Sequence, residues 1–167
     1  MNRAPESDEA LLERFQRAAF DYFLTECNPA NGLVADTTRA GSPASIAVVG
    51  FALSSYPVGV ERGWMTRAAA AARTLATLRF FWSSRQSEAG DATGYKGFYY
   101  HFLDMQTGAR VWQSELSLID STLLLAGVLT ASVYFGEETP IEEEIRTLAG
   151  ELYLRVDWQW ADRKSVV

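Results

Sequence analysis

The stretch SLIDSTLLL, residues 117–125, is the most informative part of this sequence. It lies in a segment from about Glu115 to Phe135 that is apolar nearly throughout and whose one internal carboxylate is Asp120. The composition predicts a helix that is buried on all sides. An ionised carboxylate on such a helix costs several kcal/mol unless it is paired or borders a polar cavity.

Two interpretations of Asp120 follow and stay open at this point. Asp120 could pair with an arginine inside the core, or it could line a pocket as a catalytic acid or base. Glu115 lies five residues earlier, so it would not share a face with Asp120 on a continuous helix. It could reach the same cavity from the helix start, or serve only as a first-turn carboxylate that the helix dipole favours.

The surrounding sequence predicts four further helices and a small β-hairpin. The helices are expected at Ser7–Glu26, from Ser42 to Tyr56 with a stop before Pro57, from the cap Thr66 to Phe81, and from Thr139 to Val156. The hairpin would pair Gly97–Asp104 with Arg110–Trp112 around a turn at Thr107 and Gly108. The predicted class is therefore all-α, and either a small bundle or a piece of a larger helical toroid fits.

Length and composition restrict the classes of function. The chain has 167 residues, and we expect residues 1–167 to form one domain with flexible ends at 1–6 and 162–167. A net charge of −6 disfavours nucleic acid as a partner. One cysteine and one histidine exclude a zinc site built from several Cys and His ligands, and we expect no metal. The absence of a signal peptide or transmembrane stretch predicts a soluble, by default cytoplasmic, protein.

Two groups of residues have the chemistry of a sugar-binding site. Tyr100, His101 and Asp104 lie in one aromatic segment, and sugars stack on aromatic rings while imidazole and carboxylate groups bind hydroxyls. A strand with one buried face would explain the same segment. The second group lies in loops at helix ends: Asp36, Arg39, Glu61, Arg62 and Trp64. Each of them singly could instead be an ordinary solvated or ion-paired loop residue.

Several motifs, taken in order, resemble the glycoamylase-like domain family. They are GSPASIAVVGFAL at 41–53, VERGWMTR at 60–67, GFYYHFLD at 97–104, IDSTLLLAG at 119–127 and RVDWQW at 155–160. The resemblance covers about Leu11 to Ala161. This family is similar to endo-β-1,2-glucanases and to a domain of cyclic β-1,2-glucan synthases. The resemblance implies an (α/α)6 toroid, here incomplete, with five to six helices and a small hairpin.

The resemblance also implies an activity and a set of site residues. It implies metal-free, cofactor-free, inverting hydrolysis of glucans, most often β-1,2-glucan, or transglycosylation in some members. Asp120 matches a functional carboxylate that is a Glu in the endo-glucanases, and Glu115, His101 and Asp104 match motif positions near the sugar cleft. Some relatives carry an Asp where this chain has Ser117, which argues against strict endo-glucanase activity.

Length is the larger departure from the family. Family domains are much longer, and their second essential carboxylate lies beyond the equivalent of Val167. We therefore expect a truncated, weakly active or inactive glycoside hydrolase whose exposed apolar faces promote self-association. The alternative hypotheses are a non-catalytic carbohydrate-binding or scaffold module and a gene remnant.

Overall fold

Six helices form most of the part of the chain that the structure, a computed structural model, describes, which is residues 6–164. They are α1 (Asp8–Thr25), α2 (Ile46–Glu61), α3 (Arg67–Ser83), α4 (Leu118–Tyr134), α5 (Pro140–Leu154) and α6 (Trp158–Lys164). Five short strands connect them: β1 (Ala44–Ser45), β2 (Gly94–Tyr95), β3 (Phe98–Tyr100), β4 (Phe102–Leu103) and β5 (Leu116–Ser117). The prediction of an all-α class with a small β element is confirmed.

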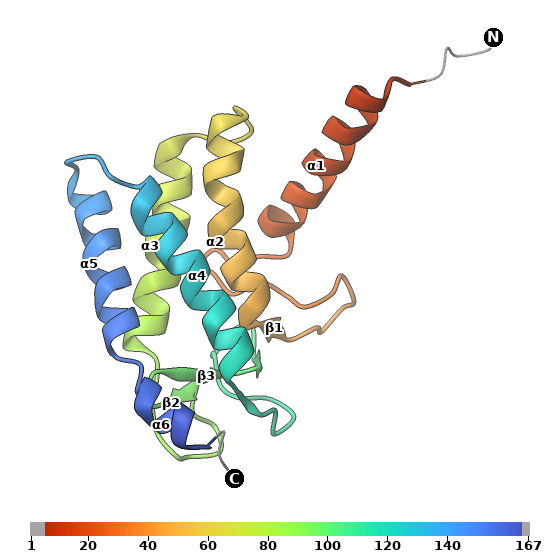
Figure 1. Cartoon of the computed structure of the whole chain (residues 1–167). Helices are drawn as coiled ribbons and strands as arrows, with labels where there is room; N and C mark the ends of the chain where they lie inside the picture. Colours follow the sequence, from red (N-terminus) through yellow and green to blue (C-terminus); the bar gives the residue numbers. More distant parts are fainter. Residues whose placement is uncertain (1–5, 165–167) are drawn as a thin grey trace.

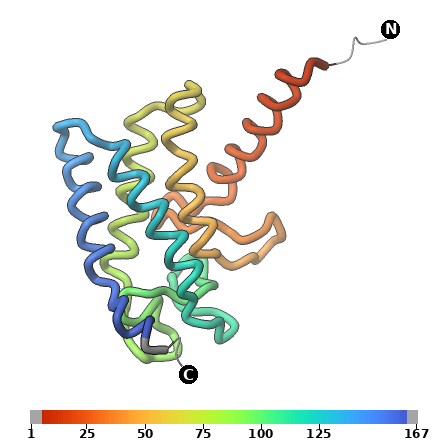
Figure 2. Tube along the Cα trace, in the orientation of Figure 1, coloured from red at the N-terminus to blue at the C-terminus, as the bar shows by residue number. Residues whose placement is uncertain are grey.

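Helices α2 to α5 lie side by side, whereas α1 projects away from them (Figure 1). Helices α2 and α4 run in the same direction and pack most closely together, and α3 and α5 run the opposite way (Figure 2). Each of the four helices therefore has one end on the same side as the strands. The starts of α2 and α4 both lie on that side.

The strands form two small antiparallel sheets at this end. β1 pairs with β4, and β3 lies between β2 and β5. Single bridges extend the first sheet on both sides, from Ala44 to Ala35 and from Leu103 to Arg110. The second bridge is the hairpin that the sequence predicts, although it is shorter than expected.

Three of the predicted helix caps are confirmed. The hydroxyls of Ser7, Thr66 and Thr139 accept hydrogen bonds from backbone N–H groups in the first turns of α1, α3 and α5. Each cap satisfies an N–H group that has no partner within the helix. Local sequence signals therefore determine where these three helices begin.

The predicted bounds of α2 are wrong at both ends. The helix begins at Ile46 because Ala44 and Ser45 are extended and pair with β4, while Ser42 accepts a hydrogen bond from the Thr37 N–H at 3.0 Å. It continues through Pro57 to Glu61. Burial of the second half of α2 outweighs the backbone hydrogen bond that a proline removes.

The prediction that the helix at 115–135 is buried on all sides is also wrong. Helix α4 packs on α2, on α5 and on β3, and nothing in residues 6–164 covers its remaining side. That side is a stripe at helical spacing whose members are all exposed: Ile119, Thr122, Ala126, Leu129, Thr130 and Val133. Ile119 and Val133 are 77% and 83% exposed. A helix that is apolar all round is here only partly covered.

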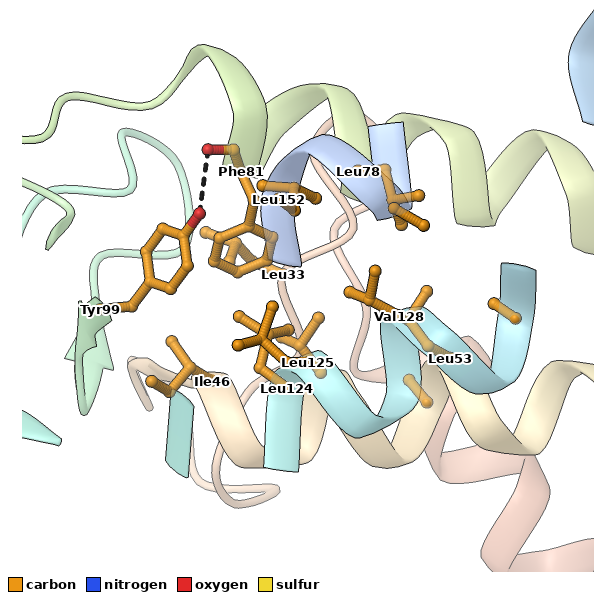
Figure 3. Close-up of a cluster of buried hydrophobic side chains, with 14 of the residues drawn as sticks. Leu33, Ile46, Leu53, Leu78, Phe81, Tyr99, Leu124, Leu125, Val128 and Leu152 are labelled. Carbon is orange, nitrogen blue, oxygen red and sulfur yellow. Dashed lines mark hydrogen bonds between the residues drawn. The ribbon is translucent and has the colours of Figure 1, made fainter. Parts of the chain in front are cut away.

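The core lies between the four packed helices and the β3 strand (Figure 3). Leu53, Leu78, Leu124, Val128 and Leu152 bring α2, α3, α4 and α5 together there. The Tyr99 hydroxyl donates to the Phe81 carbonyl at 3.2 Å, so the buried phenol has a partner. This bond attaches the sheet to the end of α3.

Helices α2 and α4 cross at two glycines. A Cβ atom on Gly127 would lie 2.2 Å from the carbonyl oxygen of Gly50, and one on Gly50 would lie 2.3 Å from the carbonyl oxygen of Leu123. The two backbones are therefore in direct contact, and no larger residue fits without separating the helices.

A buried ion pair joins α3 to α5 at the end of the helices opposite the strands. Arg67 Nε and Nη2 lie 2.8 and 2.9 Å from the two carboxylate oxygens of Glu142, which is 3% exposed. Arg67 also contacts Glu137 at 3.0 Å and donates to the Tyr134 carbonyl. Mainly through its hydrogen bonds, Arg67 holds the pKa of Glu142 below its usual value.

No helix within residues 6–164 has both the length and the hydropathy that crossing a bilayer requires. Of the chain ends that the sequence analysis expects to be flexible, residues 1–5 and 165–167 lie outside the described residues. Residues 162–164 belong to α6, a helix that the sequence analysis does not predict.

We predict that Gly127→Ala lowers the free energy of unfolding by about 2–3 kcal/mol, because the methyl group must push α2 and α4 apart. Gly150→Ala is the matched control, because Gly150 lies in α5 with no atom within 4 Å of its Cβ position. This control should gain about 0.5–1 kcal/mol from reduced unfolded-state entropy. Urea unfolding measures both values, and equal effects would contradict the close crossing.

We predict that Glu142→Gln lowers the free energy of unfolding at pH 7 by about 3 kcal/mol, because Arg67 loses its buried partner. A lowered folded-state pKa stabilises the fold above the unfolded pKa, near 4.5, and this contribution is lost as the pH falls through the folded value. The wild type should therefore lose more stability than Glu142→Gln between pH 5 and acid unfolding.

Glu144→Gln is the control for this ion pair. Glu144 lies on α5, as Glu142 does, and pairs at the surface with Arg79 of α3; their side chains are 39% and 60% exposed. Because this pair is exposed to solvent, its loss should leave the free energy of unfolding close to the wild-type value. Parallel pH dependence of wild type and Glu142→Gln in urea titrations would refute the role given to Glu142.

Candidate functional site

Three titratable side chains from separate parts of the sequence meet at the strand end of the helices. His101 Nδ1 lies 2.8 Å from Glu115 Oε1 and 3.5 Å from Asp120 Oδ2. The side chain of Asp120 is 17% exposed, that of His101 27% and that of Glu115 65%. Asp120 is thus not sealed in the core, and among the described residues it pairs with no arginine; it lies at the rim of a polar cluster with His101.

The backbone of the two sheets holds these residues in place. His101 lies between β3 and β4, and its N–H donates to the Glu115 carbonyl at 3.0 Å. Its own carbonyl accepts from Ile46 N–H, the first residue of α2, at 3.2 Å. Glu115 lies just before β5 rather than on α4, so the rotation that would separate it from Asp120 on one helix does not apply.

Ser117 caps α4 and orients Asp120. Its hydroxyl accepts from the Asp120 N–H at 3.1 Å and donates to Asp120 Oδ2 at 2.6 Å. The carboxylate thus lies in the first turn, where the helix dipole favours a negative charge. Within the described residues no hydrogen bond is made to Oδ1, so this oxygen is available to a ligand.

Glu115 is a carboxylate suited to accepting a proton or a hydrogen bond. Its pKa lies below the usual value, first because its own backbone N–H donates to it and then because His101 does so. A group whose pKa is lowered in this way is ionised at neutral pH and is a poor proton donor. Glu115 therefore serves better as a partner of His101 than as an acid.

Aromatic and cationic groups surround the cluster. The His101 ring stacks on Phe102 with centroids 3.9 Å apart, and the Arg110 guanidinium lies 4.2 Å above the Tyr100 ring. Tyr100 is 8% exposed and borders a hollow of about 360 Å³ with Tyr95, Leu116, Leu118 and Trp160. Tyr100 is thus close to the cluster but largely covered.

Asp104 lies outside the cluster. Its Oδ1 accepts hydrogen bonds from the N–H groups of Gln106 and Thr107 and from the Thr107 hydroxyl, at 2.8–3.0 Å. These bonds, led by the backbone N–H of Thr107, lower its pKa. The carboxylate stabilises the hairpin turn, which explains an Asp at this position without a ligand.

The other predicted residues are also not brought to the cluster. Glu61, Arg62 and Trp64 follow the far end of α2, where Glu61 accepts from the Tyr134 hydroxyl at 2.7 Å and Arg62 pairs with Glu13 at 2.8 Å. Sixteen residues of α2 separate them from His101, about 24 Å of helix. Arg39 lies in the loop between Ala35 and Ala44, near the strand end.

Sequence reasoning missed one exposed aromatic residue at this end of the molecule. The sequence predicts that Trp112 ends a strand at Arg110–Trp112, but the structure places it in a loop with 73% of its surface exposed. A tryptophan within a polar, turn-rich segment is the only sequence signal for it. Its side-chain position depends on contacts from distant residues.

The three clustered residues could also hold a divalent cation. One ligand atom from each of His101, Glu115 and Asp120 lies within 4.8 Å of the others. Binding would require His101 to give up its hydrogen bond to Glu115, since both would use the same atoms. The cluster as it stands is held by its own hydrogen bonds.

Comparison with known proteins places the chain among carbohydrate-active relatives, although no family model matches the sequence. It is 30% identical over 162 residues to an exo-β-1,2-glucooligosaccharide sophorohydrolase from Parabacteroides distasonis. The match covers 93% of this chain and 21% of that protein. The chain therefore spans about a fifth of the length of this relative.

Solved structures of this group have the same fold. A β-1,2-glucanase from Parabacteroides distasonis aligns with a TM-score of 0.82 and 28% identity, over 96% of this chain and 23% of its own. A presumed glucoamylase from Bacteroides uniformis aligns with the same score and identity, and the alignment covers 95% of this chain and 38% of that protein. An endo-β-1,2-glucanase from Chitinophaga pinensis, in complex with sophorotriose and glucose, shares the fold at 18% identity and a TM-score of 0.80.

These comparisons confirm the resemblance that the sequence motifs indicate. The chain is related to glucoamylase-like and β-1,2-glucan-hydrolysing proteins and matches part of their length. The helices described above are correspondingly part of a glucoamylase-like helical toroid.

Proposed function

We propose that this chain, a relative of glucoamylase-like and β-1,2-glucan-hydrolysing proteins, contributes Asp120 to a site that acts on glucans. The observation that carries the proposal is the position of Asp120, at a helix start beside His101 and with one carboxylate oxygen without a partner in the described residues. The names of the relatives support β-1,2-glucan as the proposed substrate.

The spacing of the carboxylates supports a division of the catalytic groups. Inverting hydrolysis needs two carboxyl groups roughly 6.5–9.5 Å apart, so that a water molecule fits between them and the sugar. The oxygens of Glu115 and Asp120 that face His101 lie within 4.8 Å of each other, and His101 bridges them. These two carboxylates are too close to form that pair.

We therefore give Asp120 one of the two roles, proton donor or activator of water, and expect the second carboxyl group to come from outside the 167 residues. Glu115 then holds His101 in place. Because Nδ1 of His101 faces both carboxylates, Nε2 is the atom that can bind a sugar hydroxyl. On this proposal the 167 residues alone bind glucans but hydrolyse them weakly or not at all.

A binding experiment with a matched control tests the role of Asp120. We predict that Asp120→Asn weakens the binding of sophorotriose, measured by calorimetry, by about tenfold, because a charge-assisted hydrogen bond to a hydroxyl is lost. Asp91→Asn is the control, because Asp91 makes an exposed ion pair with Arg85. It should bind like the wild type.

Three results would contradict parts of this proposal. Equal affinities for wild type and Asp120→Asn would remove Asp120 from the site. A wild-type chain that binds no β-1,2-linked oligosaccharide would refute the substrate class. The need for a second carboxyl group would be refuted if the chain released reducing sugar from β-1,2-glucan as fast as the full-length sophorohydrolase assayed alongside. Binding without hydrolysis also fits a non-catalytic module.

We also propose that the exposed apolar side of α4 mediates self-association of the 167-residue chain. Ile119, Leu129 and Val133 are 77%, 39% and 83% exposed on one helix face. Sedimentation at tens of micromolar should show dimers that Val133→Lys disrupts. Leu12→Lys on α1, where Leu12 is 61% exposed, should leave them intact. A monomeric wild type would overturn this part.

A further inference from the structure

Trp112 lies on a loop whose backbone is held in an unusual conformation. Trp112 and Gln113 have φ angles of 54° and 52°, in the left-handed region that residues other than glycine rarely adopt. A residue in this conformation is strained and persists only where its surroundings enforce it. The result is an indole ring that is 73% exposed.

Arg110 enforces this conformation. Its Nε donates to the Ser114 carbonyl and its Nη2 to the Gln113 carbonyl, both at 2.6 Å. The Arg110 guanidinium also lies 4.2 Å above the Tyr100 ring, and this contact fixes the orientation of its N–H groups. Arg110 thus anchors the loop at Gln113 and at the residue that follows it, while the ring of Trp112 stays exposed.

The position of Trp112 connects it to the cluster around Asp120. Its ring lies 5.4 Å from that of Phe102, which in turn stacks on His101 at 3.9 Å. Trp112 is therefore one aromatic ring away from His101, and its own ring is exposed. A ligand longer than one sugar unit could reach both.

A hollow of about 350 Å³ opens beside Trp112. The loop from Asp36 to Pro43 forms its other wall, because the Ala35–Ala44 and Leu103–Arg110 bridges bring the two loops to the same edge of the small sheet. The side chains of Asp36 and Arg39 border this hollow. Within the described residues neither has a side-chain hydrogen bond or ion pair.

We propose that this hollow is a second subsite, which binds one glucosyl unit of a glucan next to the unit held at Asp120. The inference rests on the proposed function for the class of ligand. A broad exposed indole can accept the C–H face of a sugar, while the charged groups of Arg39 and Asp36 can hydrogen-bond its hydroxyls. The volume suits a small ligand.

Substitutions in the two walls of the hollow test the subsite. In calorimetric titrations with sophorotriose, Trp112→Ala should weaken binding about five- to tenfold, and Trp112→Phe should restore most of the affinity. Arg39→Ala should weaken it about three- to tenfold. Phe15→Ala is the control, because Phe15 on α1 is 56% exposed and far along the chain from the hollow; it should bind like the wild type.

The outcomes separate this inference from the proposed function. Suppose that the wild type binds and that Asp120→Asn weakens binding, but that Trp112→Ala and Arg39→Ala do not. Only the subsite is then refuted, and Trp112 would instead serve as a contact for another protein. If wild type binds no sophorotriose, both proposals fall. Circular dichroism melting curves of each variant show whether it is folded, and the Arg39→Ala variant keeps the test decisive if Trp112→Ala unfolds.

Discussion

The contact between the backbones of α2 and α4 at Gly50 and Gly127 is the constraint on which the rest of the structure depends. It makes the two helices parallel neighbours, so that both begin at the end where the strands lie. The N–H of Ile46, at the start of α2, then donates to the His101 carbonyl, and the first turn of α4 carries Asp120. Two helix starts and one short sheet thus converge on one small region.

The two ends of the helices have different roles. At the far end, the buried pair of Arg67 and Glu142 ties α3 to α5 and to the turn after α4. At the strand end, charged groups are left at the surface beside aromatic rings, in the cluster around His101 and in the hollow beside Trp112. Removing one partner of a buried pair destabilises a fold, whereas polar atoms at a rim that are still without a hydrogen bond, such as Asp120 Oδ1, are available to a ligand.

Sequence reasoning succeeded where a signal is local. Ser7, Thr66 and Thr139 mark helix starts because the capping hydrogen bond spans only three residues. It failed where distant residues compete, as at Ser45, which joins a strand pair with Phe102, and at Pro57, which stays helical because that part of α2 is buried. Sequence alone also did not show that Glu61, Arg62 and Trp64 lie at the opposite end of α2 from His101.

The sequence by itself determined the all-α class, the family resemblance and the unusual carboxylate in an apolar segment, because these depend on composition, spacing and motifs. Only the tertiary structure decided which groups meet Asp120. Glu115 and His101 reach that region through the pairing of β3 with β5, and Trp112 lies on a loop whose conformation Arg110 holds. Such contacts depend on where the backbone turns, and no local pattern encodes that.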